Sequence, residues 1–239
     1  MTAPTPFARL RRYAPDLRQA SHAHDAAHLS LILAGGFEET ACHRAEAAVP
    51  GRVGLRPEGL RHAVAFSAAG ALVLTCQAPH REDGRPVVSD PAWSPVLPRN
   101  YLRRLVPLLL EGGDAAAEAG WDLLALCGDA PARPEPDRWL RAVRDRLVES
   151  PGSARLSDLA REAGRHRVHL SRAFLAAWGE TPSVFRRRSM LDRALCLTAL
   201  GQPAAAAALD AGFTDQSHFN RACRDLYGMP PGRLVSRAA

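Results

Sequence analysis

The sequence His169-Leu-Ser-Arg-Ala-Phe-Leu-Ala-Ala-Trp-Gly-Glu-Thr-Pro182 returns 49 residues later as His218-Phe-Asn-Arg-Ala-Cys-Arg-Asp-Leu-Tyr-Gly-Met-Pro-Pro231. The two copies share His, Arg, Ala, Gly and Pro at equivalent places. Upstream of them, Ala160-x-x-Ala163-Gly164 is matched by Ala208-x-x-Ala211-Gly212. A helix, a Gly-containing turn and a second helix therefore occur twice, which predicts two helix-turn-helix units.

The second helix of each unit is predicted to have a packing stripe and a free stripe. Leu170, Ala173, Phe174 and Ala177 recur at helical spacing in the first unit, as do Phe219, Ala222, Cys223 and Leu226 in the second. The remaining side chains are of the kinds that contact base edges and phosphates. The DNA-contacting residues are predicted to be Arg167, Val168, Ser171, Arg172, Gln216, Ser217, His218, Asn220, Arg221 and Arg224.

One long helix is predicted to join the two units. Pro182 to Leu200 is about 19 residues, roughly 28 Å at 1.5 Å per residue. Such a helix could hold two reading helices about one DNA turn, roughly 34 Å, apart. A plain helical bundle with solvated arginines is the alternative, but it would not need to repeat its Arg, Gly and Pro in register.

The positive charge of the chain lies in its C-terminal part. The whole chain carries a formal charge of +6. From Asp137 onward there are 17 Arg against 10 Asp and Glu, a net of +7, and before it 14 against 15, a net of −1. This asymmetry is typical of a domain that meets a polyanion. All the cations are Arg, which a GC-rich genome would also explain.

The N-terminal part has a different pattern of apolar residues. Short apolar runs at Leu29–Ala34, Val64–Phe66 and Leu72–Thr75 are cut by Gly, Pro and charged residues, which predicts strands. Two helices follow between Tyr101 and Cys127, and Gly128–Pro136 has the composition of a linker. We expect a β-domain over residues 1–98, a helical segment and linker over 99–136, and a DNA-binding domain over 137–239.

The C-terminal pattern resembles the AraC/XylS family of transcription regulators, over roughly Trp139 to Arg237. The most specific part is Gly212-Phe-Thr-Asp-Gln-Ser-His-Phe-Asn-Arg221 followed by Gly228-Met-Pro-Pro231. The resemblance implies an α+β chain, with a cupin-like β-barrel that senses an effector and an all-α double helix-turn-helix domain. It implies double-stranded DNA and RNA polymerase as partners. His166 stands where the family usually has a Ser cap, which should cost about 1 kcal/mol.

Two motifs in the N-terminal part resemble those of cupins. His22-x-His24-x-x-x-His28, followed by six residues and Gly35, is similar to the first, with His28 in place of the usual Glu. Gly51-x5-Pro57-x-Gly59-x-x-His62 is similar to the second. Even spacing on one strand would put His22, His24 and His28 on one face, and His62 would join them from another strand. The four are candidate ligands for zinc or a similar divalent transition metal. Alternatively they line a pocket for a small organic effector.

Other functions remain open at this stage. The main rival is a cupin metalloenzyme fused to a DNA-binding module, although no general base is evident. Ala41-Cys42-His43-Arg44 faintly resembles the nucleophile motif of alkyl-DNA repair transferases, but it sits where a turn is expected. No catalytic residue is therefore predicted.

Partners and location follow from simpler patterns. The apolar stripe Leu102, Leu105 and Leu109 would serve either a homodimer or the barrel of its own chain. The five scattered cysteines fit reduced thiols, and the absence of a signal peptide or membrane span predicts a cytoplasmic protein with no membrane partner.

Overall fold

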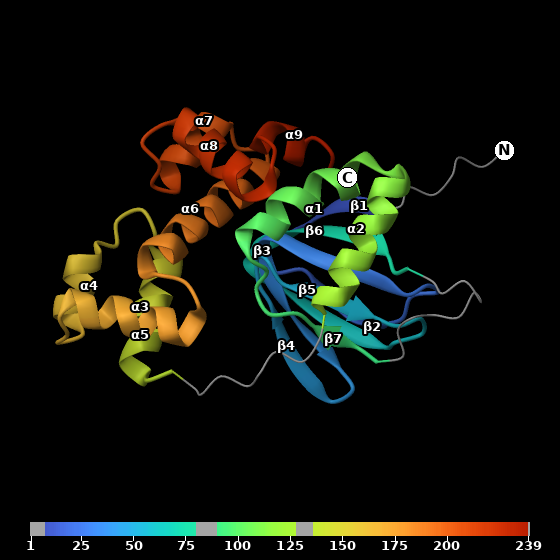
Figure 1. The fold of residues 1–239 in the computed structure, drawn as a ribbon, viewed down its shortest axis with the longest axis horizontal. Coiled ribbons are helices and arrows are strands. Elements are labelled where there is room, and N and C mark those ends of the chain that lie inside the picture. The colour runs from blue at the N-terminus through green and yellow to red at the C-terminus, as the bar shows by residue number, and fades with distance from the viewer. Residues whose placement is uncertain (1–7, 80–89, 128–135, 239) are drawn as a thin grey trace.

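The computed structural model describes residues 8–79, 90–127 and 136–238. A strand-rich N-terminal domain lies beside a helical C-terminal part (Figure 1). The strands are β1 (Ala8–Tyr13), β2 (Arg18–His22), β3 (His28–Ala41), β4 (Arg44–Ala48), β5 (Val53–Arg56), β6 (His62–Gln77) and β7 (Ala92–Trp93). The helices are α1 (Arg99–Glu111), α2 (Gly113–Leu126), α3 (Arg138–Glu149), α4 (Leu156–Glu162), α5 (Arg167–Trp178), α6 (Pro182–Ala199), α7 (Ala204–Asp210), α8 (Gln216–Tyr227) and α9 (Pro231–Val235).

Two long antiparallel strands, β3 and β6, form the middle of the sheet. The hydrogen-bonded order is β1-β6-β3-β5-β7, with β2 added to the first half of β6 and β4 to the second half of β3. The three predicted apolar runs all lie in these two central strands. A strand-rich domain is therefore confirmed. The predicted barrel needs correction, because the path of paired strands does not close into a ring in the described part of the chain.

The strand β3 bends in its middle. Its pairing with β6 shifts register between Ile32 and Ala34 and again between Gly35 and Phe37. Such irregularities bend a strand and release backbone groups from the ladder. On the two sides of the bend, β3 has different neighbours: its first half pairs with β5 and its second half with β4.

The helices α1 and α2 pack on this sheet (Figure 1). As predicted, the chain breaks between them at Gly112 and Gly113. Leu102, Leu105 and Leu109 are buried in one core with the strands of their own chain. The apolar stripe of α1 thus covers its own sheet and is not free for a partner helix.

The repeat produces two helix-turn-helix units, α4–α5 and α7–α8, joined by α6. Gly179 and Gly228 end the second helices in the left-handed conformation, both at φ 75°, and Pro182 and Pro231 begin the next helices. Glycine at the C-terminal cap and proline at the first helical position are local signals, which explains why the sequence predicts these boundaries well.

The cap expected to be missing from α5 is present. The backbone N–H of Val168 donates to Nδ1 of His166 at 3.3 Å. In α8 the equivalent bond runs from the backbone N–H of His218 to Oδ1 of Asp215 at 2.7 Å. An imidazole nitrogen thus replaces the hydroxyl oxygen as an acceptor, so the expected loss of a cap was wrong.

The two units belong to different hydrophobic cores. The first has a core of its own, formed by Leu140, Val143, Leu147, Leu159, Ala160, Leu170, Phe174 and Phe185. The second shares one continuous core with the sheet and α1, to which α6 and α8 contribute Leu191, Leu195, Phe219 and Tyr227. The helices α1 and α3 begin close to the predicted domain boundaries 99 and 137. The core that joins the sheet to α6 and α8, however, contains residues from both sides of the boundary at 137.

Hydrogen bonds also join α6 and α8 to the sheet at the bend of β3. The register skips Leu33, whose carbonyl accepts the hydroxyl proton of Tyr227. The N–H of Gly35 donates to Oδ1 of Asp192 at 2.5 Å. Burial raises the pKa of Asp192 to about 6, which backbone and arginine contacts partly oppose. The bend is therefore the place where the connecting helix and α8 attach to the sheet.

Candidate functional site

The predicted reading faces are open to solvent on both second helices. In α5 the side chains of Leu170 and Phe174 are fully buried, whereas Val168 and Leu175 are 49% and 46% exposed. Arg167 and Arg172 are exposed and Ser171 is half-buried. The stripe expected to pack and the stripe expected to be free are thus both in place.

The face of α8 has the same arrangement with more polar side chains. Gln216, Ser217, Arg221 and Arg224 are exposed and Asn220 is half-buried. His218 is partly engaged inside the chain. Its Nδ1 lies 3.3 Å from Oγ1 of Thr214, and its ring meets that of Phe213 edge-on at 5.0 Å.

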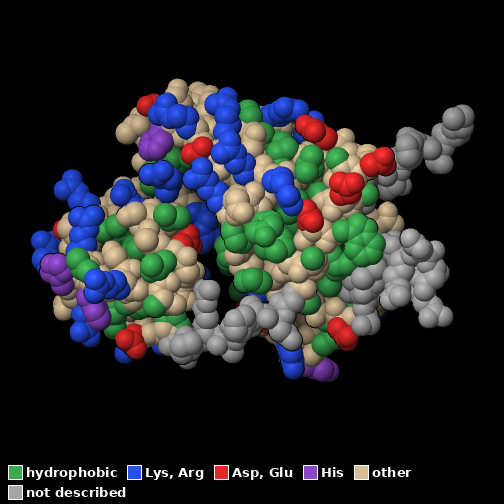
Figure 2. Space-filling view, in the orientation of Figure 1, with side chains coloured by type: hydrophobic (Ala, Val, Ile, Leu, Met, Phe, Trp, Pro, Cys, Tyr) green, Lys and Arg blue, Asp and Glu red, His purple; other side chains and the backbone are tan. Residues whose placement is uncertain are grey.

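Arginine side chains gather over the helical C-terminal part, as Figure 2 shows for one face of the molecule. They are concentrated over the regions of both helix-turn-helix units, whereas acidic side chains are more frequent near α2. The charge asymmetry of the sequence therefore becomes a surface feature suited to a polyanion.

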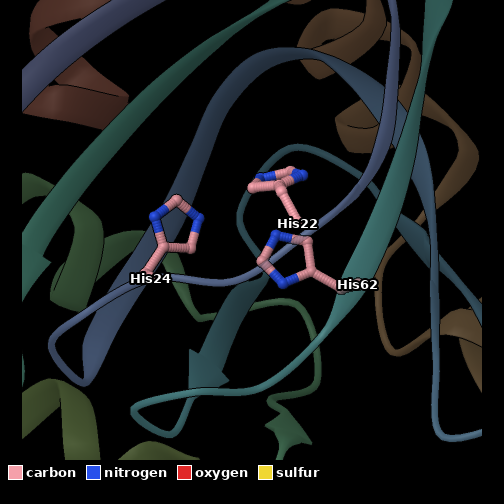
Figure 3. Close-up of side chains that lie close together, drawn as sticks. All are labelled: His22, His24 and His62. Atoms are coloured by element: carbon pink, nitrogen blue, oxygen red, sulfur yellow. The ribbon is translucent and has the colours of Figure 1, made fainter.

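Three of the four predicted histidines form a compact cluster, drawn in Figure 3. One nitrogen from each of His22, His24 and His62 lies within 4.8 Å of the others. The ring centroids of His22 and His62 are 4.5 Å apart, and those of His24 and His62 are 5.2 Å apart. His28 stands outside this set, although its ring lies 4.6 Å from that of His24.

The cluster arises in a different way from the one predicted. His22 ends β2, His24 lies in the following turn and His28 begins β3, so even spacing on one strand does not bring them together. Instead His22 pairs with His62 in the β2–β6 register. The N–H of Gly59, in the turn after β5, donates to the carbonyl of His24 at 2.9 Å and fixes the third member.

The hydrogen bonds leave nitrogen lone pairs free in the cluster. Nδ1 of His22 lies 2.8 Å from the carbonyl of Ala20, which makes it a donor and leaves Nε2 as an acceptor or ligand. Nδ1 of His62 is buried and has no hydrogen-bond partner among the residues that the structure describes. Its other nitrogen, Nε2, faces Oε1 of Glu39 at 4.0 Å, too far for a hydrogen bond.

Glu39 is held in place by its own partners. Nε of Arg56 donates to its Oε1 at 2.5 Å, and Nε1 of Trp93 donates to its Oε2 at 3.1 Å. Both charged side chains of the ion pair are almost fully buried. Glu39 therefore places a fixed negative charge beside the cluster without a hydrogen bond to His62.

Burial favours the uncharged form of His24, His28 and His62. Burial lowers the pKa of His62 to about 4, an effect that Arg56 increases and Glu39 opposes. Burial and Arg56 likewise lower the pKa of His28 to about 4. Burial and His22 lower the pKa of His24. Neutral imidazole is the form that binds metals.

The cluster lies in a cavity of about 500 Å³ on the sheet, whose lining includes Arg9, Arg11 and Arg56. That volume suits a small ligand. A second cavity, of about 630 Å³, lies between the sheet and the first helix-turn-helix unit, with Gly36 and Val96 on one side and Trp178 on the other.

The cysteine pattern considered in the sequence lies in a hairpin turn. Cys42 and His43 connect β3 to β4 and both have positive φ, 49° and 61°. Cys42 is exposed. The segment therefore forms a turn, as the sequence indicated. In the described part of the chain, no helix is both long and apolar enough to cross a membrane.

Two helix-turn-helix units on one connecting helix, with exposed polar reading faces and an arginine-rich surface, define a DNA-binding protein. Residues 159–237 match the family model described as a helix-turn-helix domain, which is of the AraC type. This part of the chain is therefore a DNA-binding domain of the AraC type.

Several solved structures are similar to the chain. ToxT from Vibrio cholerae is 10% identical with a TM-score of 0.43, over 97% of this chain and 98% of that one. A probable AraC family transcriptional regulator from Rhodopseudomonas palustris is 27% identical with a TM-score of 0.39, over 43% and 98%. The C-terminal domain of AraT, a response regulator from Geobacillus stearothermophilus, is 19% identical with a TM-score of 0.41, over 44% and 91%. No functionally curated protein matches the chain.

Proposed function

We propose that this regulator changes its affinity for DNA when a divalent transition metal of the zinc type binds His22, His24 and His62. The observation that carries the proposal is the cluster of three imidazoles with nitrogens within 4.8 Å of one another. Three histidines form a common zinc site that keeps a coordination position open. A buried Nδ1 without a partner on His62 is a cost that a metal would remove.

The sheet offers a route from this cluster to the DNA-binding part. The strand β3 begins at His28, which lines the cavity, and its bend at Leu33 and Gly35 binds Tyr227 and Asp192. An occupant that favours one shape of β3 would thus favour one placement of α6 and α8. Occupancy regulates only if the metal binds one arrangement more tightly than another.

A small acidic effector is the second candidate occupant. The cavity of about 500 Å³ is larger than a metal needs, and Arg9 and Arg11 among its lining residues favour an anion. An acid could bind there beside the metal or instead of it. We propose a regulatory role for this site in preference to catalysis, because the chain carries it on a DNA-binding protein. Product formation from candidate substrates by the metal-loaded chain would contradict this choice.

Metal analysis of untagged protein is expected to find one divalent metal per chain. Replacing both His24 and His62 by alanine should weaken binding by more than about 100-fold, because even outer residues of metal sites contribute 10–100-fold. His28→Ala is the matched control, since His28 lines the same cavity outside the cluster. Affinity for a DNA site selected from random sequences should change with metal in the wild type and the control but not in the double variant.

Acid should weaken the metal-free protein in a defined range. The pKa of His62 is about 4 in the folded chain and 6.5 ordinarily, so the unfolded chain binds more protons between these values. Stability is therefore complete above about pH 6.5 and falls as pH drops toward 4. Metal should oppose this fall. Substoichiometric metal in the wild type, or equal affinity of the double variant, would refute the metal site.

The contacts to DNA are proposed to come from the exposed stripes of α5 and α8, with Arg172 and Arg221 at equivalent positions. If each reaches a base edge, replacing either by alanine should weaken the binding free energy on the selected site by about 1–3 kcal/mol. Base preference should then relax only in the group of base pairs, or block, that the altered helix contacts. Titrations on the selected site and on single-base variants would measure this. Equal weakening on all sequences would make them phosphate contacts, and unchanged affinity would refute the docking model.

A further inference from the structure

Besides sharing the connecting helix, the two units meet where the turn after α3 contacts the turn before α8. The first unit has its own core and faces the sheet across the cavity of about 630 Å³, whereas the second is built into the core of the sheet. The spacing of α5 and α8 therefore depends on how firmly the first unit is attached to α6. That attachment is made by Phe185 of α6, which lies in the core of the first unit, and by the turn between α3 and α4.

Two arginines of α6 donate hydrogen bonds to the end of α3 and the turn that follows it. Nε of Arg186 donates to the carbonyl of Pro151 at 2.6 Å, and its Nη2 donates to the carbonyl of Gly152 at 2.8 Å. About two turns along α6, Nη1 of Arg193 donates to the carbonyl of Glu149 at 3.4 Å. Carbonyls at and beyond the end of a helix lack helical partners, so a guanidinium forms charge-assisted bonds there.

The turn between α3 and α4 also contacts the second unit directly. Gly212 lies in the turn between α7 and α8, and a Cβ on it would come within 2.1 Å of the Cα of Gly152. A Cβ on Gly152 would come within 2.7 Å of the Cα of Gly212. The contact is thus backbone against backbone, which leaves little freedom to slide. Arg186, Gly152 and Gly212 together form a clamp between the two units.

We propose that this clamp fixes the distance and rotation between the two reading helices and thereby decides which spacing of two base-contact blocks the protein accepts. The inference rests on the proposed function of α5 and α8 as readers. One added base pair moves a block by about 3.4 Å and rotates it by about 35°. A rigidly clamped pair of helices cannot follow this change without losing contacts, whereas a loosened pair can.

The experiment begins with the full-length wild type, whose preferred two-block site is selected from random DNA. Affinity is then measured on versions of that site with one or two base pairs added to or removed from the spacer. Each change is expected to weaken binding of the wild type by about tenfold or more, as loss of a specific contact does. A half-site carrying one block serves as the reference for each protein.

Two variants act on the clamp in different ways. Arg186→Gln removes both charge-assisted bonds. A changed spacer length is then expected to weaken DNA binding by only about threefold or less. The affinity of this variant for the half-site should stay within about twofold of wild type. Arg186→Lys should restore part of the penalty, because it keeps one charged donor. Gly152→Ala introduces a Cβ between the turns and should weaken the original spacing relative to a neighbouring one.

The matched control is Arg187→Gln. Arg187 is the exposed neighbour of Arg186 on α6, so its replacement removes the same charge without touching the turn. It is expected to weaken all spacings equally. Unchanged spacing preference in folded Arg186→Gln and Gly152→Ala proteins would overturn the clamp, as would a wild type that accepts every spacing. Failure to select any two-block site would instead contradict the proposed roles of both helices as readers.

Discussion

Gly212→Ala is expected to destabilise the protein by about 2–5 kcal/mol. The residue has φ +95°, where an L side chain costs about 1–2 kcal/mol. The added Cβ would also lie 2.1 Å from the backbone of Gly152, and such overpacking costs about 1–3 kcal/mol more. Urea unfolding followed by circular dichroism would measure the loss, together with the protection of α7 and α8 against hydrogen exchange.

Gly164→Ala separates the two contributions. Gly164 occupies the equivalent turn of the first unit with φ +62°, but a Cβ there would meet no atom within 4 Å. Its replacement should cost only the conformational strain, about 1–2 kcal/mol. Equal losses for the two variants would mean that the turns of the two units do not press on each other.

Tyr227→Ala is expected to cost about 3–5 kcal/mol, as truncation of a large buried aromatic side chain does. The side chain is 1% exposed and lies in the core that α8 shares with the sheet. Its loss should therefore loosen β3 as well as α8. Hydrogen exchange should show reduced protection of the amides of β3 and β6, although the substitution lies at the end of α8.

Two further variants sharpen this prediction. Tyr227→Phe keeps the ring but leaves the carbonyl of Leu33 without its donor, which should cost about 1–3 kcal/mol. Phe174→Ala removes an equally buried ring from the separate core of the first unit. It should reduce protection only in α3, α4 and α5. If Tyr227→Ala leaves the sheet as protected as in the wild type, the shared core is not a cooperative unit.

The histidine cluster forms through contacts other than those that the sequence pattern indicated. The sequence singled out His22, His24, His28 and His62, and three of them converge. The expected reason was alternation along one strand, but the chain turns between His22 and His28. Strand pairing between His22 and His62 and the bond from Gly59 to His24 bring the rings together instead. Those contacts are not visible in local spacing.

The sequence by itself determined the helix-turn-helix repeat, because the signals that define it are local. Glycine in the left-handed caps, proline at helix starts and apolar stripes at helical spacing act within one or two turns of chain. Only the tertiary structure decided that the second unit joins the core of the sheet, that Leu102, Leu105 and Leu109 cover their own strands, and that Gly152 meets Gly212. These contacts join residues far apart in the chain, and many partners for each apolar face satisfy the same sequence pattern. Shape complementarity, which appears only when all the elements pack together, selects among them.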